Sequence, residues 1–333
     1  MLFQRRFRPV IGLDITTSSI KLIELTRSGD SYRVESYAAE PTPPNAINEK
    51  AIVDAQAVGE AVRRAVKRAG ARSKECAVAV SGDAAITKVI QMPRNLRANE
   101  LESQVEMQAD QYIPFPMEEV SYDFEVVGPS EKDPEMLDVL LVATRSENVE
   151  QRQAAVQAAG LTARIVDVEA FALENACRLL THQMPDGGME RSIAVVDFGA
   201  SSTTFSVLRD TKVAYTRDFS FGGQQLTEEI MRTYGLSMEE AGRAKKEGGL
   251  PANYQSEVLD PFIDDMCQQV SRSLQFYLAA GAGRVQPEQI LICGGCANIP
   301  GVADVIASRV GSLAERGDPP GPMKRSTRAL AQE

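Results

Sequence analysis

Two stretches of the sequence share one pattern of apolar and polar positions. In residues 193–208 an apolar run leads into Asp197, a short polar turn follows, and apolar positions then alternate with polar ones. A continuous apolar run is typical of a strand buried on both faces, and alternation is typical of a half-buried strand. The pattern therefore predicts a β-hairpin. Residues 10–25 repeat this pattern around Asp14 near the start of the chain.

The turn of the second hairpin carries residues suited to phosphate. Gly199 lets the backbone approach a ligand, and the hydroxyls and N–H groups of Ser201, Ser202 and Thr203 can donate to phosphate oxygens. Asp197 can hold a Mg²⁺ ion through a water molecule. Asp-x-Gly alone is a weak signal, because many turns of this kind bind nothing. The repeat of the pattern strengthens it.

The first hairpin offers a matching set of polar groups. Asp14 ends its apolar run and is a second candidate for Mg²⁺ held through water, and Lys21 lies on the exit strand, within reach of a phosphate. Two halves that each open with such a hairpin can hold a Mg-nucleotide between them. The candidate phosphate and metal ligands of the first half are Asp14, Thr16, Thr17, Ser18 and Lys21.

A third element follows in residues 290–301. An apolar strand runs into Gly294, Gly295 and Asn298 before the next helix begins, which predicts a glycine-rich turn able to face a base and ribose. Upstream, Ser237 and Glu240 predict a short helix that begins with a capping box.

In this order and spacing the three elements resemble the actin-like ATPase superfamily, which includes actin, heat-shock chaperones, sugar kinases and FtsA. The resemblance covers about Val10 to about Val310 and implies a two-lobed α/β actin-like (ribonuclease-H-like) fold that binds ATP and Mg²⁺. Within the superfamily the chain is similar to the type IV pilus assembly family PilM, and the segments that carry this similarity are residues 41–46, 108–120, 166–170 and 221–227.

The resemblance and the changes of pattern divide the chain into four parts. The order strand, helix, strand, strand, helix indicates an inserted subdomain, and the resemblance implies that it is an FtsA-type α/β subdomain. After Val310 the prolines at 319, 320 and 322 exclude regular structure, and few apolar residues follow. The expected parts are a first lobe of residues 8–83 and 164–190, the inserted subdomain of residues 84–163, a second lobe of residues 191–311, and an atypical, disordered tail of residues 312–333.

The resemblance also assigns roles to single residues. Lys245 falls where the superfamily has a lysine that touches adenosine, although the glutamate of that motif is Gly242 here. Asp167 and Glu169 lie at the crossover between the halves, where the superfamily orients the attacking water. The alternative is that these acids stabilise a helix N-terminus. Thr16 replaces a glycine of the superfamily. These features imply at most a slow ATPase.

A partner site is implied for the inserted subdomain. In PilM-like proteins the groove beside it receives the short cytoplasmic N-terminus of the inner-membrane protein PilN. The segment Tyr112, Ile113, Pro114 and Phe115 is the expected contact. The alternative is that its prolines end a helix and fix the entry of the next strand. The implied function is an ATP-binding cytoplasmic component of the type IV pilus assembly complex, which serves pilus biogenesis and twitching motility.

Composition limits the other functions. The chain has 333 residues and a formal net charge of −10, without a block of basic residues, which argues against nucleic-acid binding. No apolar run is long enough to span a bilayer, so we expect a cytoplasmic chain that reaches the inner membrane through partners. The first eight residues hold three arginines and two phenylalanines, which a frayed end or an interfacial membrane contact would explain.

Cysteine and histidine offer little to a catalytic or metal site. The pair Cys293 and Cys296 forms a C-x-x-C, but no second pair or histidine lies nearby, which favours small residues at a strand end over a redox or zinc site. The single histidine, His182, lies in a turn-like segment. Two rival functions stay open: a small-molecule kinase of the same superfamily, and a scaffold of the pilus complex that binds no nucleotide.

Overall fold

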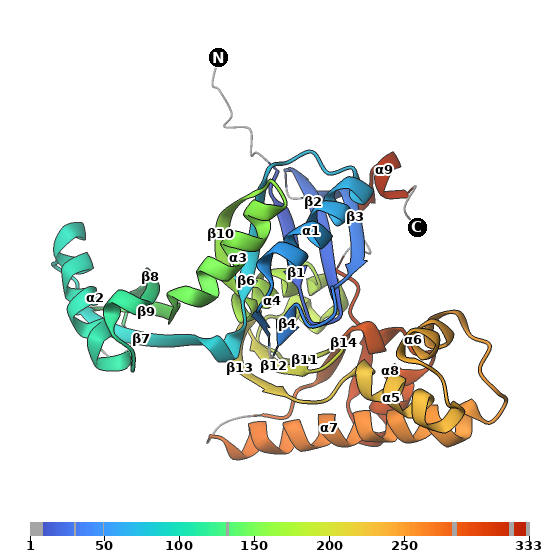
Figure 1. Ribbon diagram of the computed structural model, residues 1–333. Coiled ribbons are helices and arrows are strands. Elements are labelled where there is room, and N and C mark those ends of the chain that lie inside the picture. The colour runs from blue at the N-terminus through green and yellow to red at the C-terminus, as the bar shows by residue number, and fades with distance from the viewer. Residues whose placement is uncertain are drawn as a thin grey trace. The chain divides into compact units, whose positions relative to one another are not determined.

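The computed structural model describes residues 9–29, 31–48, 50–130, 133–281, 285–319 and 323–330. The chain forms two compact units, coloured along the sequence in Figure 1. Unit 1 comprises Met1–Glu169 together with Met323–Glu333, and unit 2 comprises Ala170–Pro322. Residues 1–8, which a frayed end or an interfacial membrane contact would explain, lie outside the described residues, as do Pro320 and Pro322.

Unit 1 contains a mixed six-stranded sheet in the order β10-β6-β1-β2-β3-β16. Helices α1 and α3 pack against each other and bury small apolar residues over this sheet (Figure 1). The strands are β1 (Ile11–Ile15), β2 (Ser19–Ser28), β3 (Ser31–Pro41), β6 (Glu75–Val80), β10 (Thr162–Val168) and β16 (Lys324–Arg325), and the helices are α1 (Ala55–Ala69) and α3 (Ser146–Ala158).

Helix α1 begins and ends at recognisable capping residues. The Asp54 carboxylate accepts a hydrogen bond from the Ala57 N–H at 2.9 Å, and Gly70 ends the helix in the left-handed region. The helix does not extend further towards the N-terminus, because Ala51–Ile52 forms β5, which pairs with β4 (Ile47–Asn48).

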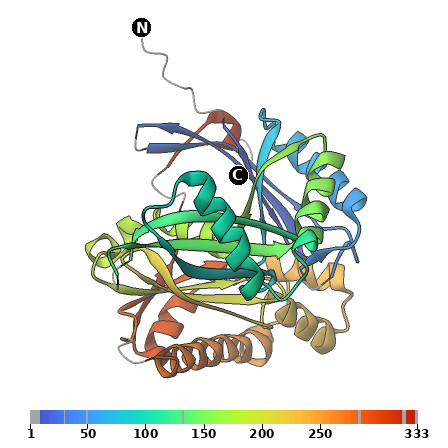
Figure 2. The ribbon, with the colours of Figure 1, turned by 90° about the vertical axis from the view of Figure 1, so that its left-hand side faces the viewer.

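The inserted segment of unit 1 builds its own three-stranded antiparallel sheet in the order β7-β9-β8. Helix α2 crosses one face of this sheet (Figure 2) and closes a separate core that includes Met92, Val105 and Leu141. The predicted order of strand, helix, strand, strand and helix is confirmed. The elements are β7 (Ala85–Pro93), α2 (Ala98–Tyr112), β8 (Val120–Pro129), β9 (Met136–Arg145) and α3.

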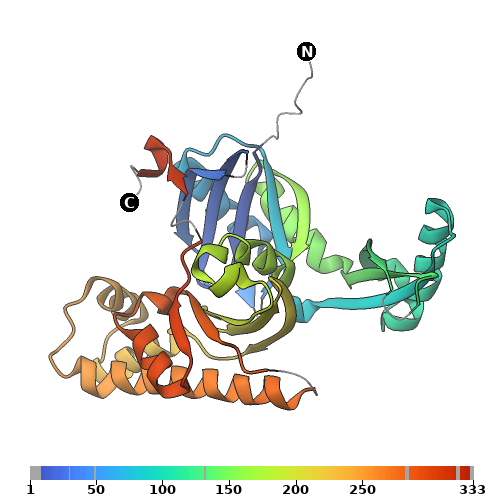
Figure 3. The ribbon, with the colours of Figure 1, turned by 180° about the vertical axis from the view of Figure 1, so that it is seen from behind.

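Unit 2 is built on a five-stranded sheet in the order β13-β12-β11-β14-β15. Helices α5, α7 and α8 supply apolar residues to one face of it (Figure 3). The strands are β11 (Ser192–Phe198), β12 (Thr203–Arg209), β13 (Lys212–Phe219), β14 (Gln289–Gly294) and β15 (Leu313–Arg316), and the helices are α5 (Gly223–Tyr234), α6 (Met238–Glu247), α7 (Asp260–Ala279) and α8 (Val302–Val310).

Strand β11 explains the continuous apolar run in the sequence. Ala194 and Val196 face the core under α5 and α7, whereas Ile193 and Val195 face a second core on the other side of the sheet. That second core also holds Cys177, Leu180 and Met184. Because the strand is buried on both faces, every position from Ile193 to Val196 is apolar.

The boundary of the first lobe differs from the one expected. Residues 170–190 were placed with the first lobe, but from Ala170 onward they belong to unit 2. The reason is the packing just described, in which α4 (Glu169–Cys177) and the turns that follow it cover β11 and β14. The finer division of unit 1 at residues 83 and 164 stays a prediction.

The C-terminal segment also differs from the expected disordered tail. β15 pairs in parallel with β14, and β16 pairs in parallel with β3. Ser326 donates its N–H to the Val34 carbonyl at 2.8 Å, and Ala329 in α9 (Thr327–Leu330) is fully buried. Short strands need few apolar residues when a sheet edge supplies the backbone partners, so composition alone missed them.

Candidate functional site

The predicted hairpin around Asp197 is present as β11 and β12. Asp197 lies across from Thr204 on β12 and from Cys293 on β14. The Gly199 N–H donates to the Ser202 carbonyl at 3.0 Å and closes the turn. The aspartate therefore stands near the end of a central strand, where two neighbouring strands fix its backbone.

Three glycine turns crowd around this aspartate, and we call Gly199, Gly222, Gly223 and Gly294 the glycine cradle. A Cβ atom at Gly294, whose φ is +82°, would overlap the Phe198 carbonyl and Asp197 Oδ1. A Cβ atom at Gly222 would lie 2.7 Å from the Gly199 carbonyl oxygen. Only glycine permits so close an approach, because any side chain would push the turns apart.

Hydrogen bonds and aromatic packing hold the cradle together. The Gly223 N–H donates to the Gly199 carbonyl at 3.0 Å and the Gln224 N–H to the Ala200 carbonyl at 2.8 Å. Phe221, just before the cradle glycines, is buried and stacks on Phe262 with ring centroids 5.3 Å apart. Packing of this ring fixes the turn that begins α5 beside the first turn.

Lys245 reaches the cradle from helix α6. Its Nζ donates to the Gly223 carbonyl at 2.8 Å and to Thr227 Oγ1 at 2.6 Å. Burial lowers the pKa of Lys245, and the nearby Cys296 partly offsets that effect. The predicted capping box is confirmed, since the Ser237 N–H donates to Glu240 Oε2 at 2.8 Å. It sets the start of the helix that carries Lys245.

The remaining predicted residues of unit 2 have mixed positions. Ser201 is exposed and Ser202 half-buried at the turn. Thr203 is fully buried, and its hydroxyl donates to the Phe221 carbonyl at 2.7 Å. This hydrogen bond stabilises the glycine cradle from its buried side. Gly295 is exposed beyond β14. The Asn298 side chain accepts from Arg316 Nη1 at 3.2 Å, a partner that the sequence did not reveal.

The hairpin around Asp14 folds differently from its counterpart. Lys21 Nζ lies 2.7 Å from Asp14 Oδ2, and both side chains are about half exposed, at 57% and 51%. The Thr16 hydroxyl donates to the Ser19 carbonyl at 2.9 Å, and the Thr42 hydroxyl donates to the Thr16 carbonyl at 2.7 Å. Thr16 needs no positive φ, so the superfamily's glycine is not required for this turn. Thr17 and Ser18 follow it in the same turn, and Ser18 Oγ lies 3.5 Å from Thr16 Oγ1.

The two crossover acids lie at the end of β10. Asp167 Oδ1 accepts the Val168 N–H at 2.7 Å, and Glu169 begins α4. Arg152, which the sequence analysis missed, is buried on α3 and donates to the carbonyls of Asn148 and Lys50 at 3.1 and 3.4 Å. Burial lowers the pKa of Arg152, and Glu169 opposes that shift.

A pocket lies beside Asp167 within unit 1, and we call it the β8–β10 pocket. Its volume is about 190 Å³. Strands β6, β7, β8, β9 and β10 and helix α3 form its walls. Its lining consists of Val80, Ala85, Ser121, Tyr122, Asp123, Val142, Ala143, Thr144, Val149, Val166, Asp167 and Val168.

Sequence comparison identifies the family. The profile described as type IV pilus assembly protein PilM matches residues 12–332. The chain belongs to the PilM family. A solved structure titled "PilM-PilN type IV pilus biogenesis complex" is 28% identical, with a TM-score of 0.75 over 96% of this chain and 91% of that chain.

More distant relatives share the actin-like ATPase fold with this PilM family member. FtsA, the cell division protein of Bacillus subtilis, is 27% identical over 261 residues, or 72% of this chain, and the chain spans 58% of that protein's length. Two solved structures match in fold. EutJ, the ethanolamine utilization protein of Carboxydothermus hydrogenoformans, has a TM-score of 0.56 at 16% identity over 98% of this chain and 87% of that chain. MreB5 of Spiroplasma citri, bound to AMPPNP, has a TM-score of 0.50 at 13% identity over 93% of this chain and 91% of that chain.

The PilM-like segment after α2 packs inside the inserted subdomain. Ile113 is buried and Phe115 lies against the same core. The Arg145 guanidinium lies 4.6 Å from the centre of the Phe115 ring, and Lys88 lies 5.5 Å from that of Tyr112. None of Tyr112, Ile113, Pro114 and Phe115 lines the β8–β10 pocket. Tyr112 and Pro114 are exposed, so both the expected partner contact and the structural explanation of the two prolines stay predictions.

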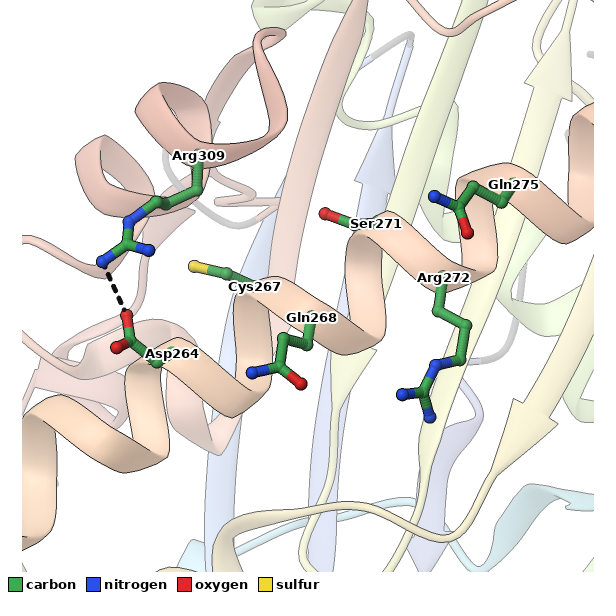
Figure 4. A pocket seen from close by; sticks show the side chains of 7 residues that line it. All are labelled: Asp264, Cys267, Gln268, Ser271, Arg272, Gln275 and Arg309. Carbon is green, nitrogen blue, oxygen red and sulfur yellow. Dashed lines mark ion pairs between the residues drawn. The ribbon is translucent and has the colours of Figure 1, made fainter.

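A second, larger groove lies in unit 2, away from the cradle. It measures about 340 Å³ and runs along α7, closed by Arg309 of α8, which lies 3.0 Å from Asp264 (Figure 4). None of the predicted site residues lines it. The other lining residues are Cys267, Gln268, Ser271, Arg272 and Gln275.

The cysteines are all unpaired thiols. Burial raises the pKa of Cys293 to about 12 and that of Cys296 to about 11, which makes thiolate chemistry unfavourable there. In the part of the chain that the structure describes, no group of three or more histidine, cysteine or acidic side chains could hold a metal ion. Among the same residues, no helix is long and apolar enough to cross a membrane.

Proposed function

We propose that the chain binds MgATP through the glycine cradle and serves as an ATP-binding cytoplasmic component of the type IV pilus inner-membrane assembly complex. The observation that carries the proposal is the contact between Gly294 and Asp197. A side chain at Gly294 would fill the space beside the Asp197 carboxylate, so the sequence keeps that carboxylate and three backbone turns close together. Glycine turns that let the backbone approach a phosphate, together with an acid that can hold Mg²⁺ through water, suit a Mg-nucleotide.

The residues present fit this cofactor. Asp197 would hold Mg²⁺ through water, Ser201 and Ser202 would donate to phosphate oxygens, and Gly199, whose N–H donates to the Ser202 carbonyl, would let the backbone come close to the phosphates. Gly294, Gly295 and Asn298 would face adenosine, with Lys245 as a fixed cation beside them. A bound Mg²⁺ supplies positive charge that neutralises the phosphates. We leave Thr203 out of the phosphate ligands because its hydroxyl is already committed to Phe221.

Unit 1 would contribute a second set of ligands. Asp14 would hold Mg²⁺ through water, and Thr17, Ser18 and Lys21 would contact phosphate. Lys21 has to leave Asp14 to do so, because the two side chains form an ion pair. Since both are half exposed, that ion pair contributes about 1 kcal/mol or less and is readily exchanged for a phosphate.

Hydrolysis, where it occurs, would be slow. Asp167 and Glu169 are the candidates for orienting water, but one oxygen of Asp167 already accepts the Val168 N–H. A general base needs a free lone pair within hydrogen-bond reach of its proton. We therefore expect the chain to act through the binding of ATP more than through its hydrolysis.

We further propose that the β8–β10 pocket receives the cytoplasmic N-terminal segment of a PilN-like inner-membrane protein. The solved relative named as a PilM-PilN complex supports this partner. Its binding would bring the chain to the inner membrane without a membrane span of its own and would serve pilus biogenesis and twitching motility. Nucleotide and partner would then influence each other's affinity reciprocally.

Calorimetric titration of MgATP into the purified chain tests the nucleotide site. We expect saturable binding that Asp197→Ala abolishes and that the matched control Asp304→Ala retains, because Asp304 is exposed on α8 and outside the cradle. A folded wild-type chain that takes up no MgATP would contradict the proposal.

A nucleotide-free scaffold of the same complex is the second candidate. One observation favours it: the Thr16 hydroxyl and the Asp14 carboxylate of the first hairpin are engaged within the turn and with Lys21. The test is to measure MgATP uptake and partner affinity in the same chain. If the chain takes up no MgATP and partner affinity is the same with and without it, the scaffold is favoured over the ATP-binding component.

A further inference from the structure

One end of the six-stranded sheet of unit 1 is rich in exposed cations. Strands β1, β3, β6, β10 and β16 run in the same direction and begin at this end, where β2 finishes. It lies at the top of unit 1 in Figure 1. We call this end, with its exposed residues Arg27, Arg72, Lys74, Lys324 and Arg325, the basic end.

The backbone of the sheet fixes where these cations lie. Arg27 is the last residue but one of β2, and β16 pairs with residues 33 and 34 of β3. The loop before β6 is held against β2, because the N–H groups of Arg72 and Ser73 donate to Glu24 Oε1 at 3.2 and 2.9 Å. Segments far apart in the sequence therefore present their cations at one end of one sheet.

The described acids at this end do not neutralise those cations. Glu24 is buried, with 2% exposure, and accepts the two backbone N–H groups just described. Glu35 is buried as well and pairs with Arg33. Glu75 forms an ion pair with Arg164 at 2.8 Å. Each of these carboxylates is thus satisfied by other groups of unit 1.

The exposed cations give the sheet two ends of opposite sign. Arg72, Lys74 and Lys324 form no ion pair with any residue in the described part of the chain. At the other end of the sheet, β1 and β10 lead to Asp14 and Asp167. The whole chain carries a net charge of −10 and is repelled by anionic surfaces, so this asymmetry permits approach through the basic end alone.

The sequence that leads into β1 adds apolar groups at the same end. β1 begins here at Ile11, and residues 1–8 precede it with three arginines, two phenylalanines and a leucine. Binding to a lipid interface strengthens when buried apolar area adds to the attraction between cations and anionic lipids. Both contributions are available at the basic end.

We infer that the basic end docks directly on the anionic lipid surface of a membrane. Its cations lie against the lipid phosphates, and the phenylalanines of residues 1–8 enter the interface. In this orientation the end of the sheet that carries Asp14 and Asp167 faces away from the lipid. The inference goes beyond the proposed nucleotide and partner sites and depends on neither of them.

Cosedimentation of the full chain with lipid vesicles tests the docking. We expect binding to vesicles that contain phosphatidylglycerol beside phosphatidylcholine, and at least about tenfold weaker binding to vesicles of phosphatidylcholine alone. Added salt should release the chain, because it screens attraction between exposed charges. A wild-type chain that stays in solution with the anionic vesicles, or that binds both kinds of vesicle equally, would overturn the inference.

Neutralising two cations at a time locates the surface. We expect Arg72→Gln combined with Lys74→Gln to weaken vesicle binding by about 25-fold, at about fivefold for each cation near the lipid. The matched control is Arg94→Gln combined with Arg97→Gln, which removes the same charge from exposed positions between β7 and α2 of the inserted subdomain. It should stay within about twofold of the wild type. Equal losses in the two pairs would mean that net charge alone governs binding and would overturn the assigned surface.

Duplex DNA distinguishes a lipid surface from another polyanion. We expect the wild-type chain to bind DNA at least about tenfold more weakly than anionic vesicles at the same phosphate concentration, because the rings enter only a lipid interface. Phe3→Ser combined with Phe7→Ser should weaken vesicle binding by about tenfold and leave DNA binding unchanged. DNA binding as tight as vesicle binding would make the basic end a nucleic-acid surface and overturn the inference. Urea denaturation of each variant checks that its fold is retained.

Discussion

The two hairpins of the chain carry the same sequence pattern but close in different ways. Around Asp197, three turns meet through glycines, and the carboxylate stands against the backbone of Gly294. Around Asp14, the turn closes on the Thr16 hydroxyl, and the carboxylate pairs with Lys21 on the adjoining strand. One hairpin is held by neighbours distant in sequence, and the other mostly by its own residues.

This difference shows that a turn motif does not reveal whether its polar groups can bind a ligand. Hydroxyl residues at both turns were counted as phosphate donors, yet the hydroxyls of Thr16 and Thr203 both donate to backbone carbonyls. Small polar side chains at turns commonly satisfy the local backbone first. A ligand site therefore depends on which groups remain after the turn has been built, and a turn motif does not show this by itself.

The largest effect is expected from Gly294→Ala. The new Cβ would overlap the Phe198 carbonyl and Asp197, and alanine is strained at a φ of +82°. We expect a loss of about 3 kcal/mol in the free energy of unfolding and loss of MgATP binding. Gly295→Ala is the matched control, because nothing lies within 4 Å of its Cβ position. Urea denaturation of both variants measures the contrast, and equal stabilities would contradict the cradle.

Neutralising the two acids compares the hairpins directly. We expect Asp197→Asn to weaken MgATP binding by about 100-fold and Asp14→Asn by about tenfold or less, because Asp14 already has Lys21 as a partner. Calorimetry on both variants gives the ratio. Equal losses of affinity would mean that the two hairpins contribute alike to MgATP binding, in spite of their different structures.

Lys245 should make the MgATP affinity of the glycine cradle depend on pH. Burial lowers the pKa of this lysine, and only its protonated form carries the positive charge that attracts the anionic nucleotide. MgATP affinity should therefore fall as the pH rises through that lowered pKa, and binding should be accompanied by proton uptake there. Lys245→Met should weaken binding by about tenfold at neutral pH and remove this part of the pH dependence. Calorimetry in buffers of different ionisation enthalpy measures the proton uptake, and an unchanged pH profile in the variant would exclude Lys245.

The smallest effect is expected from Thr16→Gly in the first hairpin. Loss of the hydroxyl and the added backbone freedom should lower the free energy of unfolding by about 1 kcal/mol. MgATP affinity should change by about threefold or less, because the turn needs no positive φ. A gain of tenfold or more in affinity would show that Thr16 obstructs the phosphate site, which would sharpen the contrast between the hairpins.

Sequence patterns predicted the local features of this chain well. Both hairpins, the order of elements in the inserted subdomain and the capping box at Ser237 depend on residues near one another, and all are confirmed. The family resemblance is confirmed as well. The assignment of ligands to single residues stays a prediction, because a sequence does not show which hydroxyls the backbone has already engaged.

What the sequence did not show depends on partners far along the chain. Arg152 is held by carbonyls of residues 50 and 148 and by Ala79, and nothing local marks it as buried. Arg316 reaches Asn298 only because β15 joins the sheet beside β14. The β8–β10 pocket likewise arises where two sheet edges meet, which no periodicity within either strand could indicate.

The pairing of β16 with β3 has a consequence for synthesis of the chain. Unit 2 is enclosed in sequence between two parts of unit 1, so residues 170–322 are made before β16 exists. Until then β3 forms an outer strand of a five-stranded sheet, with its hydrogen-bonding groups open to other strands. On the ribosome this edge is a site for mispairing or chaperone capture, and completion of unit 1 is a late event of folding.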